Sequence, residues 1–195
     1  VLVEVVYEDG QMELADVSTR EDGEVAVRFH DDAFGLVAPT PASEACPSKC
    51  SDDRNHLSGH HWTGTLSWSY RDAGRPAALD RAQTIAALGN GAAGGPGVRD
   101  ACGLADDVGM TQSYLGETHT APNISASPGG DIVCGSTDGH NVIGWSELPG
   151  PTLGVTCTWS YASGRAAESD MLYDASVAWY TSNTAPAGCS SQFSL

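Results

Sequence analysis

Residues 141–161 read N-V-I-G-W-S-E-L-P-G-P-T-L-G-V-T-C-T-W-S-Y. Two apolar runs, Asn141 to Leu148 and Gly154 to Tyr161, flank a turn segment with two prolines and a glycine. Apolar runs of this length between turn residues predict β-strands. Three further runs read in the same way. They span Thr65–Tyr70, Val108–Gly116 and Glu168–Tyr173.

One helix is predicted between the first two of those three runs. Asp80 is a good N-cap, because its carboxylate accepts hydrogen bonds from the free N–H groups of the first turn, and Gln83 completes a capping box. The glycines from Gly89 to Gly97 are expected to end the helix. A face of small residues is predicted to lie on the sheet: Ala82, Ile85, Ala86 and Gly89.

These elements predict an α+β fold, a twisted mixed sheet of about five strands with one packed helix, preceded by a small β-hairpin unit. In that unit Val1, Val3 and Val5 alternate with other residues, and E-D-G-Q supplies a turn before the next run. We predict three parts. Residues 1–37 are a β-rich leading segment (a pro-region remnant or small domain), 38–55 a Pro/Cys linker, and 56–195 the main domain.

The charge of the chain excludes several partners. Twenty-five acidic against nine basic residues give a formal charge of −16, which repels nucleic acid and anionic membrane surfaces. No run of 18 apolar residues occurs, so no membrane-spanning segment is predicted. We expect a monomer.

Six cysteines indicate structural disulfides and an oxidising compartment, hence a secreted protein. They are Cys46, Cys50, Cys102, Cys134, Cys157 and Cys189. The one close pair, C-P-S-K-C, has no second pair to complete a zinc ribbon, and 15 disulfide connectivities remain open.

Five strings, in order, carry a family resemblance. They are C-G-L-A-D (102–106), S-Y-L-G-E-T (113–118), D-G-H-N-V-I-G-W (138–145), T-C-T-W (156–159) and E-S-D (168–170). They resemble the upper subdomain of secreted bacterial matrixin-type metzincins, which are zinc endopeptidases. The resemblance implies that residues 56–195 are an incomplete metalloprotease-like catalytic domain that binds a protein or peptide substrate.

In that family the next element is a helix with the motif H-E-x-x-H-x-x-G-x-x-H, whose histidines bind the catalytic zinc and whose glutamate activates water. The 195 residues contain no H-E-x-x-H and stop at Leu195, where that helix is expected. We therefore expect no catalytic residue in this chain, no zinc ligand, and no activity from the chain alone.

The resemblance also implies a substrate-binding strand. In matrixins a strand ending in L-A-H-A forms the sheet edge along which an extended peptide lies. The matching residues here are Leu153, Gly154, Val155 and Thr156, and the alternative is an interior or capped strand.

The family's other metal sites match poorly. Its structural-zinc histidines correspond to Val155 and Leu172, so we expect no structural zinc, with disulfides supplying rigidity instead. Asp138 and Asp174 match two calcium-binding acids, but Val177 replaces a glutamate, so a calcium site at the two aspartates is possible but not favoured.

Two other interpretations stay open. One is a non-enzymatic, secreted, disulfide-stapled β-rich binding module that uses Tyr161, Tyr173 and Tyr180 as exposed aromatics. The other is a degenerate protease domain retained for binding. The histidines His56, His60 and His61 are predicted to lie in a surface loop and not to bind metal.

Overall fold

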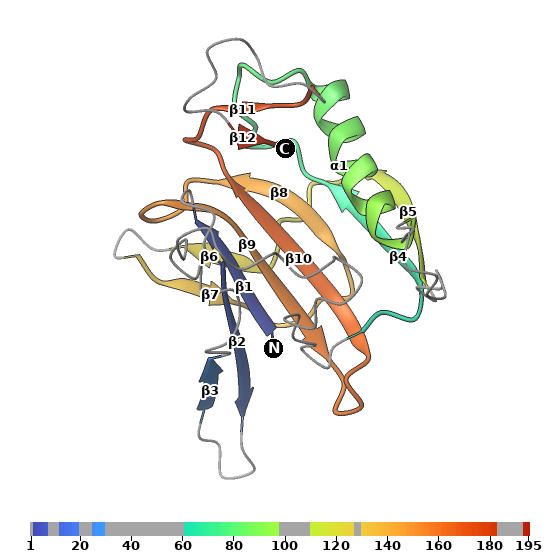
Figure 1. Cartoon of the computed structure of the whole chain (residues 1–195), viewed down its shortest axis with the longest axis vertical. Coiled ribbons are helices and arrows are strands. Elements are labelled where there is room, and N and C mark those ends of the chain that lie inside the picture. Colours follow the sequence, from blue (N-terminus) through green and yellow to red (C-terminus); the bar gives the residue numbers. More distant parts are fainter. Residues whose placement is uncertain are drawn as a thin grey trace, which may run out of the picture.

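The computed structural model describes residues 2–7, 12–19, 25–29, 61–97, 110–126, 130–182 and 193–195. Within these residues the fold is α+β, with one helix, α1 (Arg81–Gly97), and one large mixed sheet (Figure 1). No described helix is long and apolar enough to cross a membrane.

The five predicted strands form the core of this sheet. In spatial order they are β5 (Met110–Glu117), β4 (Gly64–Tyr70), β8 (Val142–Ser146), β10 (Ala166–Asp174) and β9 (Thr152–Ser160). The first four strands run parallel to one another, and β9 is antiparallel to β10. The prediction of a mixed sheet with one helix is thus confirmed.

The leading segment extends this sheet. Strands β1 (Leu2–Tyr7), β2 (Met12–Thr19) and β3 (Val25–Phe29) form an antiparallel meander, as the hairpin pattern predicted. However, β1 also pairs with β9, so the sheet has eight strands in the order β3-β2-β1-β9-β10-β8-β4-β5. The pairing satisfies backbone N–H and C=O groups along β9 that an open edge would leave free. Residues 38–55 lie outside the described residues, so the linker stays a prediction.

Two short strand pairs lie outside the large sheet. Strands β6 (Ile124–Ala126) and β7 (Ile132–Cys134) pair antiparallel, and β11 (Trp179–Tyr180) pairs in parallel with β12 (Phe193–Ser194). The predicted disulfide bonding is borne out for Cys134 and Cys157, which link β7 to β9. The other four cysteines lie outside the described residues.

The helix begins where the sequence predicted and ends later. The Gln83 N–H donates to the Asp80 carboxylate over 2.9 Å, which confirms the N-cap. The glycine-rich run does not end α1, which continues to Gly97. A Cβ on Gly89 would lie at ordinary van der Waals distance, 4.0 Å, from the Trp68 ring.

The prediction of which helix residues lie on the sheet was also partly wrong. Ala82 and Ala86 are exposed, whereas the buried helix residues are Thr84 and Leu88. The larger Leu88 side chain fills the space over the sheet that alanines would leave empty.

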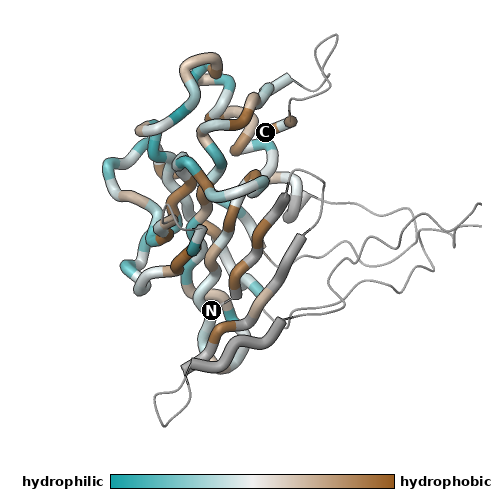
Figure 2. The backbone as a smooth tube through the Cα atoms, turned by 90° about the vertical axis from the view of Figure 1, so that its left-hand side faces the viewer, coloured by the Kyte–Doolittle hydropathy of each residue, from teal (hydrophilic) through white to brown (hydrophobic). Residues whose placement is uncertain are grey.

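Apolar residues fill both faces of the sheet. On one face, under α1, lie Trp68, Tyr70, Leu79, Leu88 and Trp145. The other face holds the second cluster: Ile124, Leu148, Val155, Cys157, Trp159 and Leu172. Alternate residues of a strand point to opposite faces, so β10 contributes Leu172 to one layer and Tyr173 to the other. Figure 2 shows the hydrophobic residues concentrated along the strands and the hydrophilic ones in the outer turns.

Candidate functional site

Two buried acidic side chains of β10 organise the loops around the sheet. Glu168 accepts hydrogen bonds from the backbone N–H groups of Asp138, over 3.0 Å, and Gly139, over 2.6 Å. Asp170 accepts from the N–H groups of Asn123, over 2.6 Å, and Val142, over 2.7 Å. The strings E-S-D and D-G-H-N, 28 residues or more apart in the sequence, therefore meet as one structural clamp.

Burial is the main cause of an altered pKa at Asp170. It raises the pKa of this carboxyl to about 6, although the backbone N–H groups of Asn123 and Val142 act in the opposite direction. The nearby Glu168 adds to the increase. Because backbone donors occupy its oxygens, the carboxyl is placed to hold the strands together.

Asn141 joins three strands of this clamp. Its side-chain Oδ1 accepts the Ser169 N–H over 2.7 Å, and its Nδ2 donates to the Ser67 carbonyl over 2.8 Å. Strands β4 and β10 are thereby fixed to the start of β8. This hydrogen-bond network gives the segments E-S-D and D-G-H-N a structural role. It places no reactive group near a cavity.

The two acids considered for calcium lie apart. Asp138 sits beside Glu168, near the start of β10, whereas Asp174 ends that strand and accepts hydrogen bonds from the Ser176 N–H and hydroxyl over 2.8 and 2.9 Å. Six residues of a strand span about 20 Å. The structure therefore does not bring Asp138 and Asp174 into one site, and no group of three possible metal ligands occurs among the described residues.

The histidines of the described part are separate as well. His61, His119 and His140 are each exposed, and the backbone of His61 forms a bridge with Arg165. His56 and His60 lie outside the described residues.

The predicted substrate-binding residues, Leu153 to Thr156, lie in β9, and Gly154, Val155 and Thr156 are paired on both sides. Leu172 of β10 pairs with Val155 on one side, and Val5 of β1 pairs with Val155 on the other. The strand is therefore not an open edge in this structure, which matches the alternative of a capped strand. The assignment of these residues to substrate binding stays a prediction.

A groove lies along this same stretch, with a volume of about 310 Å³. All four predicted residues line it, together with Met171, Tyr173, Trp179, Phe193 and Ser194. The Tyr173 and Trp179 rings meet edge to face with centroids 5.4 Å apart. Gly154 leaves room for Tyr173, because a Cβ there would lie 3.7 Å from its ring and 3.2 Å from the Leu172 carbonyl.

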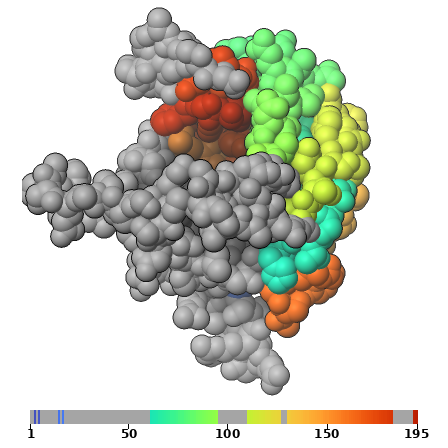
Figure 3. Space-filling model, turned by 45° about the vertical axis from the view of Figure 1, so that its right-hand side comes forward, coloured from blue at the N-terminus to red at the C-terminus, as the bar shows by residue number. Residues whose placement is uncertain are grey.

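A larger cavity of about 500 Å³ adjoins the groove and shares Met171, Tyr173 and Ser194 with it. Its opposite wall is α1, including Leu88 and Ala92. In Figure 3 the red C-terminal residues and the green helix lie on either side of this hollow.

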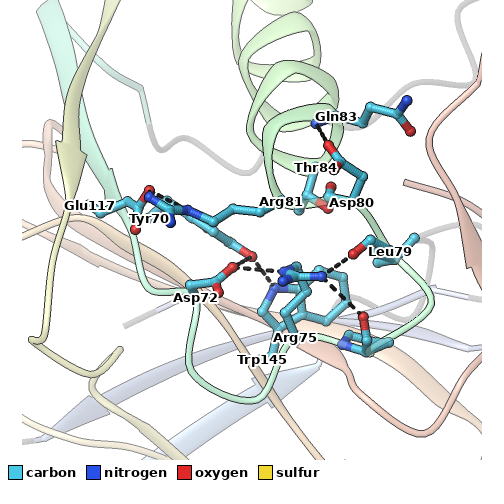
Figure 4. A network of polar contacts seen from close by, with 11 residues as sticks. Tyr70, Asp72, Arg75, Leu79, Asp80, Arg81, Gln83, Thr84, Glu117 and Trp145 are labelled. Carbon is cyan, nitrogen blue, oxygen red and sulfur yellow. Dashed lines mark hydrogen bonds and ion pairs between the residues drawn. The ribbon is translucent and has the colours of Figure 1, made fainter.

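A polar network fixes the chain between β4 and α1 (Figure 4). The buried Tyr70 hydroxyl accepts from the Trp145 indole N–H over 2.9 Å and donates to Asp72 over 3.1 Å. Arg75 donates to the same Asp72 oxygen over 2.8 Å and also to the Leu79 carbonyl. Although burial opposes ionisation, hydrogen bonds from Arg75 and Tyr70 hold the pKa of Asp72 below its usual range.

Several groove residues had no signal in the sequence. Trp179 and Phe193 come from short strands that no alternation predicted. Tyr173 and Tyr180, expected as exposed aromatics, are half-buried, Tyr173 against Trp145 and Trp179, whereas Tyr161 is exposed as expected. The alternation of Met171 and Tyr173 in β10 is the one pattern from which their shared face follows.

Comparison of the chain with models of known protein families, with curated proteins and with solved structures finds no match.

Proposed function

We propose that this chain is the substrate-binding upper part of a secreted zinc-dependent metalloendopeptidase, with β9 as the strand that binds an extended peptide. One observation carries the proposal. The stretch Leu153 to Thr156, singled out by sequence resemblance, both forms a strand on the outer side of the five-stranded core and lines a groove. Peptide recognition by strand addition requires a side-chain groove beside a strand with free backbone groups, so on β9 it also requires that β1 leaves the strand.

Each part of the site has a distinct role in this proposal. With β1 displaced, the N–H and C=O groups of β9 would orient the peptide without regard to its sequence. The groove beside Gly154, with Tyr173 and Trp179 in its wall, accepts an apolar side chain. The buried Glu168 and Asp170 act at a distance by fixing β10, on which β9 is aligned.

The zinc of such an enzyme finds no ligands in the described residues, since they contain no group of three His, Cys, Asp or Glu side chains. The whole sequence lacks H-E-x-x-H. Ligands and general base would have to come from sequence outside these 195 residues. No step of hydrolysis is assigned to this chain. The disulfide between Cys134 and Cys157 supports a secreted location.

The test is a peptidase assay on the natural gene product that contains these residues, purified and supplied with zinc. We expect casein hydrolysis that 1,10-phenanthroline abolishes, and none from the 195 residues alone. Gly154→Ala narrows the groove and is expected to raise KM. Gly94→Ala is the matched control, because a Cβ there meets nothing within 4 Å.

Absence of hydrolysis by the zinc-supplied gene product would refute the proposal. The rival, a secreted binding module, would then be favoured. In such a module, the exposed Tyr161 is the residue best placed to bind a partner. The Arg165 guanidinium carbon lies 4.3 Å from the centroid of its ring. An unchanged KM for Gly154→Ala would remove the groove from substrate binding.

A further inference from the structure

Strand β5 lies at an edge of the large sheet, at the end opposite the leading segment. It pairs in parallel with β4 on one side, and no strand among the described residues pairs with its other side. The register with β4 is regular from Met110 to Tyr114, so these five residues form a straight stretch of strand. An edge of this kind presents backbone N–H and C=O groups that can pair with another strand.

The edge lacks the features that usually prevent such pairing. Natural edge strands often carry a lysine, another charge or a proline, or are interrupted early by a bulge. The segment Met110 to Gly116, M-T-Q-S-Y-L-G, has no charged residue and no proline, and its register with β4 shifts only after Tyr114. Two of its large hydrophobic side chains are exposed, Tyr114 by 37% and Leu115 by 66%. An uncharged edge with exposed hydrophobic residues is typical of an interface.

The charge around β5 indicates which kind of partner fits. The chain has a formal charge of −16, but residues 61–97 and 110–120, which contain β4, α1 and β5, hold three acidic residues and three arginines. Among these acids, Asp72 and Glu117 each form an ion pair with an arginine. Figure 3 shows the green helix, the yellow β5 segment and the cyan β4 segment together on one flank of the molecule. A basic partner would find no attraction at this balanced flank, whereas a second copy of the chain meets no local repulsion there.

Contacts with β4 fix the direction of the β5 side chains. Gln112 accepts a hydrogen bond from the Trp68 indole N–H over 2.9 Å, and the Tyr114 ring lies 4.7 Å from the Trp68 ring between centroids. Both residues therefore lie on the helix-bearing face, where Trp68 is buried. The Thr111 and Thr65 hydroxyls are hydrogen-bonded over 2.9 Å on the other face. Residues that are directly opposite in an antiparallel pair share a face, so a strand can pair with its own copy about a two-fold axis perpendicular to the sheet.

We propose that two copies of this chain associate through β5, in an antiparallel β5–β5 pair centred on Ser113. In this register Tyr114 lies opposite Gln112 of the second copy, and Leu115 lies opposite Thr111 of the second copy. The pairing thus covers both exposed hydrophobic residues of the edge and satisfies its backbone groups. The association differs from the monomer expected from the sequence, and it does not involve β9 or the groove.

The helices leave room for this arrangement. Helix α1 packs through Leu88 on Trp68 of β4, so in the dimer the two α1 helices lie above strands that are three strand spacings apart. That separation is about 14 Å. Helices in contact have axes about 8–10 Å apart, so the two copies of α1 do not collide.

The first test is sedimentation equilibrium of the full chain at concentrations from about 1 to about 300 μM, because a ladder this short makes a weak, concentration-dependent dimer. The negative charges outside the β5 flank still repel at a distance. We therefore expect the dimer to become stronger when salt is raised from about 0.05 to about 0.5 M, which screens this repulsion. A monomer at every concentration, in both salt conditions, would overturn the proposal.

Charged residues placed on the edge test whether β5 is the interface. The double variant Thr111→Lys and Leu115→Lys puts like charges opposite each other in the proposed register, and we expect its dimer Kd to rise about tenfold or more. Thr111→Lys with Leu115→Glu puts opposite charges face to face and should dimerise more tightly than the two-lysine variant. The matched control is Val133→Lys with Tyr161→Lys, which adds the same charge at two other exposed hydrophobic residues. Equal weakening by the two lysine pairs, or by neither, would overturn the proposal.

A cysteine at the two-fold axis tests the register. Ser113→Cys places two thiols opposite each other with Cα atoms about 4.5–5.5 Å apart, which a disulfide can span. Thr111→Cys is the control, because the two copies of this residue would lie four residues, about 13 Å, apart along the strands. In a glutathione redox buffer we expect Ser113→Cys, and not Thr111→Cys, to give more covalent dimer than the unaltered chain on a non-reducing gel. The reverse result, or no added dimer from either variant, would overturn the register centred on Ser113.

Discussion

Val155 and Leu172 face each other across β9 and β10, and both are buried, with 1% and 4% of their surface exposed. These are the two positions at which the resemblance to matrixins places histidines of a structural zinc site. Here the side chains provide no ligand atom and belong to an apolar cluster with Cys157, which is disulfide-bonded to Cys134. Packing and a covalent link thus hold β9 to its neighbours at these positions.

Leu172→Ala is expected to lower the free energy of unfolding by about 2–5 kcal/mol, because it leaves a cavity in a close-packed cluster. Urea unfolding followed by tryptophan fluorescence measures the change. Leu115→Ala, at a residue that is 66% exposed, serves as the control and should stay within about 0.5 kcal/mol of the unaltered chain. Equal effects of the two substitutions would contradict the apolar cluster.

Loss of the disulfide should also destabilise the fold. Cys134 and Cys157 are 23 residues apart, and closing a loop of this size stabilises a protein by about 3 kcal/mol through the entropy of the unfolded chain. The double variant Cys134→Ala and Cys157→Ala should unfold at correspondingly lower urea concentration. If the urea midpoint stays the same, the disulfide does not serve the stabilising role that we assign to it.

The strands could be predicted because their signals are local. Trp68 and Tyr70 alternate with polar residues in β4, and both prove buried on the helix-bearing face. Which other strand a strand pairs with depends on residues far away in the sequence, so a local pattern does not predict it. The alternation of Val3 and Val5 predicts a strand and a buried face, but it does not say that β9, about 150 residues later, supplies that face.

The candidate site was predictable only where a family pattern existed. Leu153 to Thr156 were selected by resemblance, whereas Trp179 and Phe193 reach the groove through the tertiary fold alone. The helix end was mispredicted for a related reason. Glycine has a low intrinsic helix propensity, yet α1 runs through the glycines to Gly97, while Leu88 packs into the cluster with Trp68.

Tyr70→Phe tests the network between β4 and α1. Removal of the hydroxyl leaves the buried Trp145 indole N–H without its acceptor and takes a donor from Asp72. We expect a loss of about 1–3 kcal/mol in unfolding free energy. Tyr161→Phe removes a hydroxyl from an exposed ring and should change little. A Tyr70 variant as stable as the Tyr161 variant would mean that the network does not stabilise the fold.

Asp170 predicts a specific pH dependence. Its pKa in the folded chain is raised to about 6, while an unfolded aspartate titrates near 3.9. Between these values the folded state binds more protons than the unfolded state, so the contribution of Asp170 to stability decreases as pH rises from about 4 to 6. Below this window its contribution is at its maximum, and above it the contribution is constant and lower by about 1–3 kcal/mol.

Asp170→Asn separates this contribution from those of other acids. The amide does not titrate, so the difference in unfolding free energy between the two chains should change across pH 4–6 and be flat above pH 7. At neutral pH the variant should be less stable by about 1–3 kcal/mol, because its NH2 group would face one of the N–H donors of Asn123 and Val142. Urea midpoints measured at half-unit steps of pH give both results. A difference that is constant from pH 4 to 7 would show that Asp170 titrates as an ordinary surface aspartate and that its burial does not control its charge.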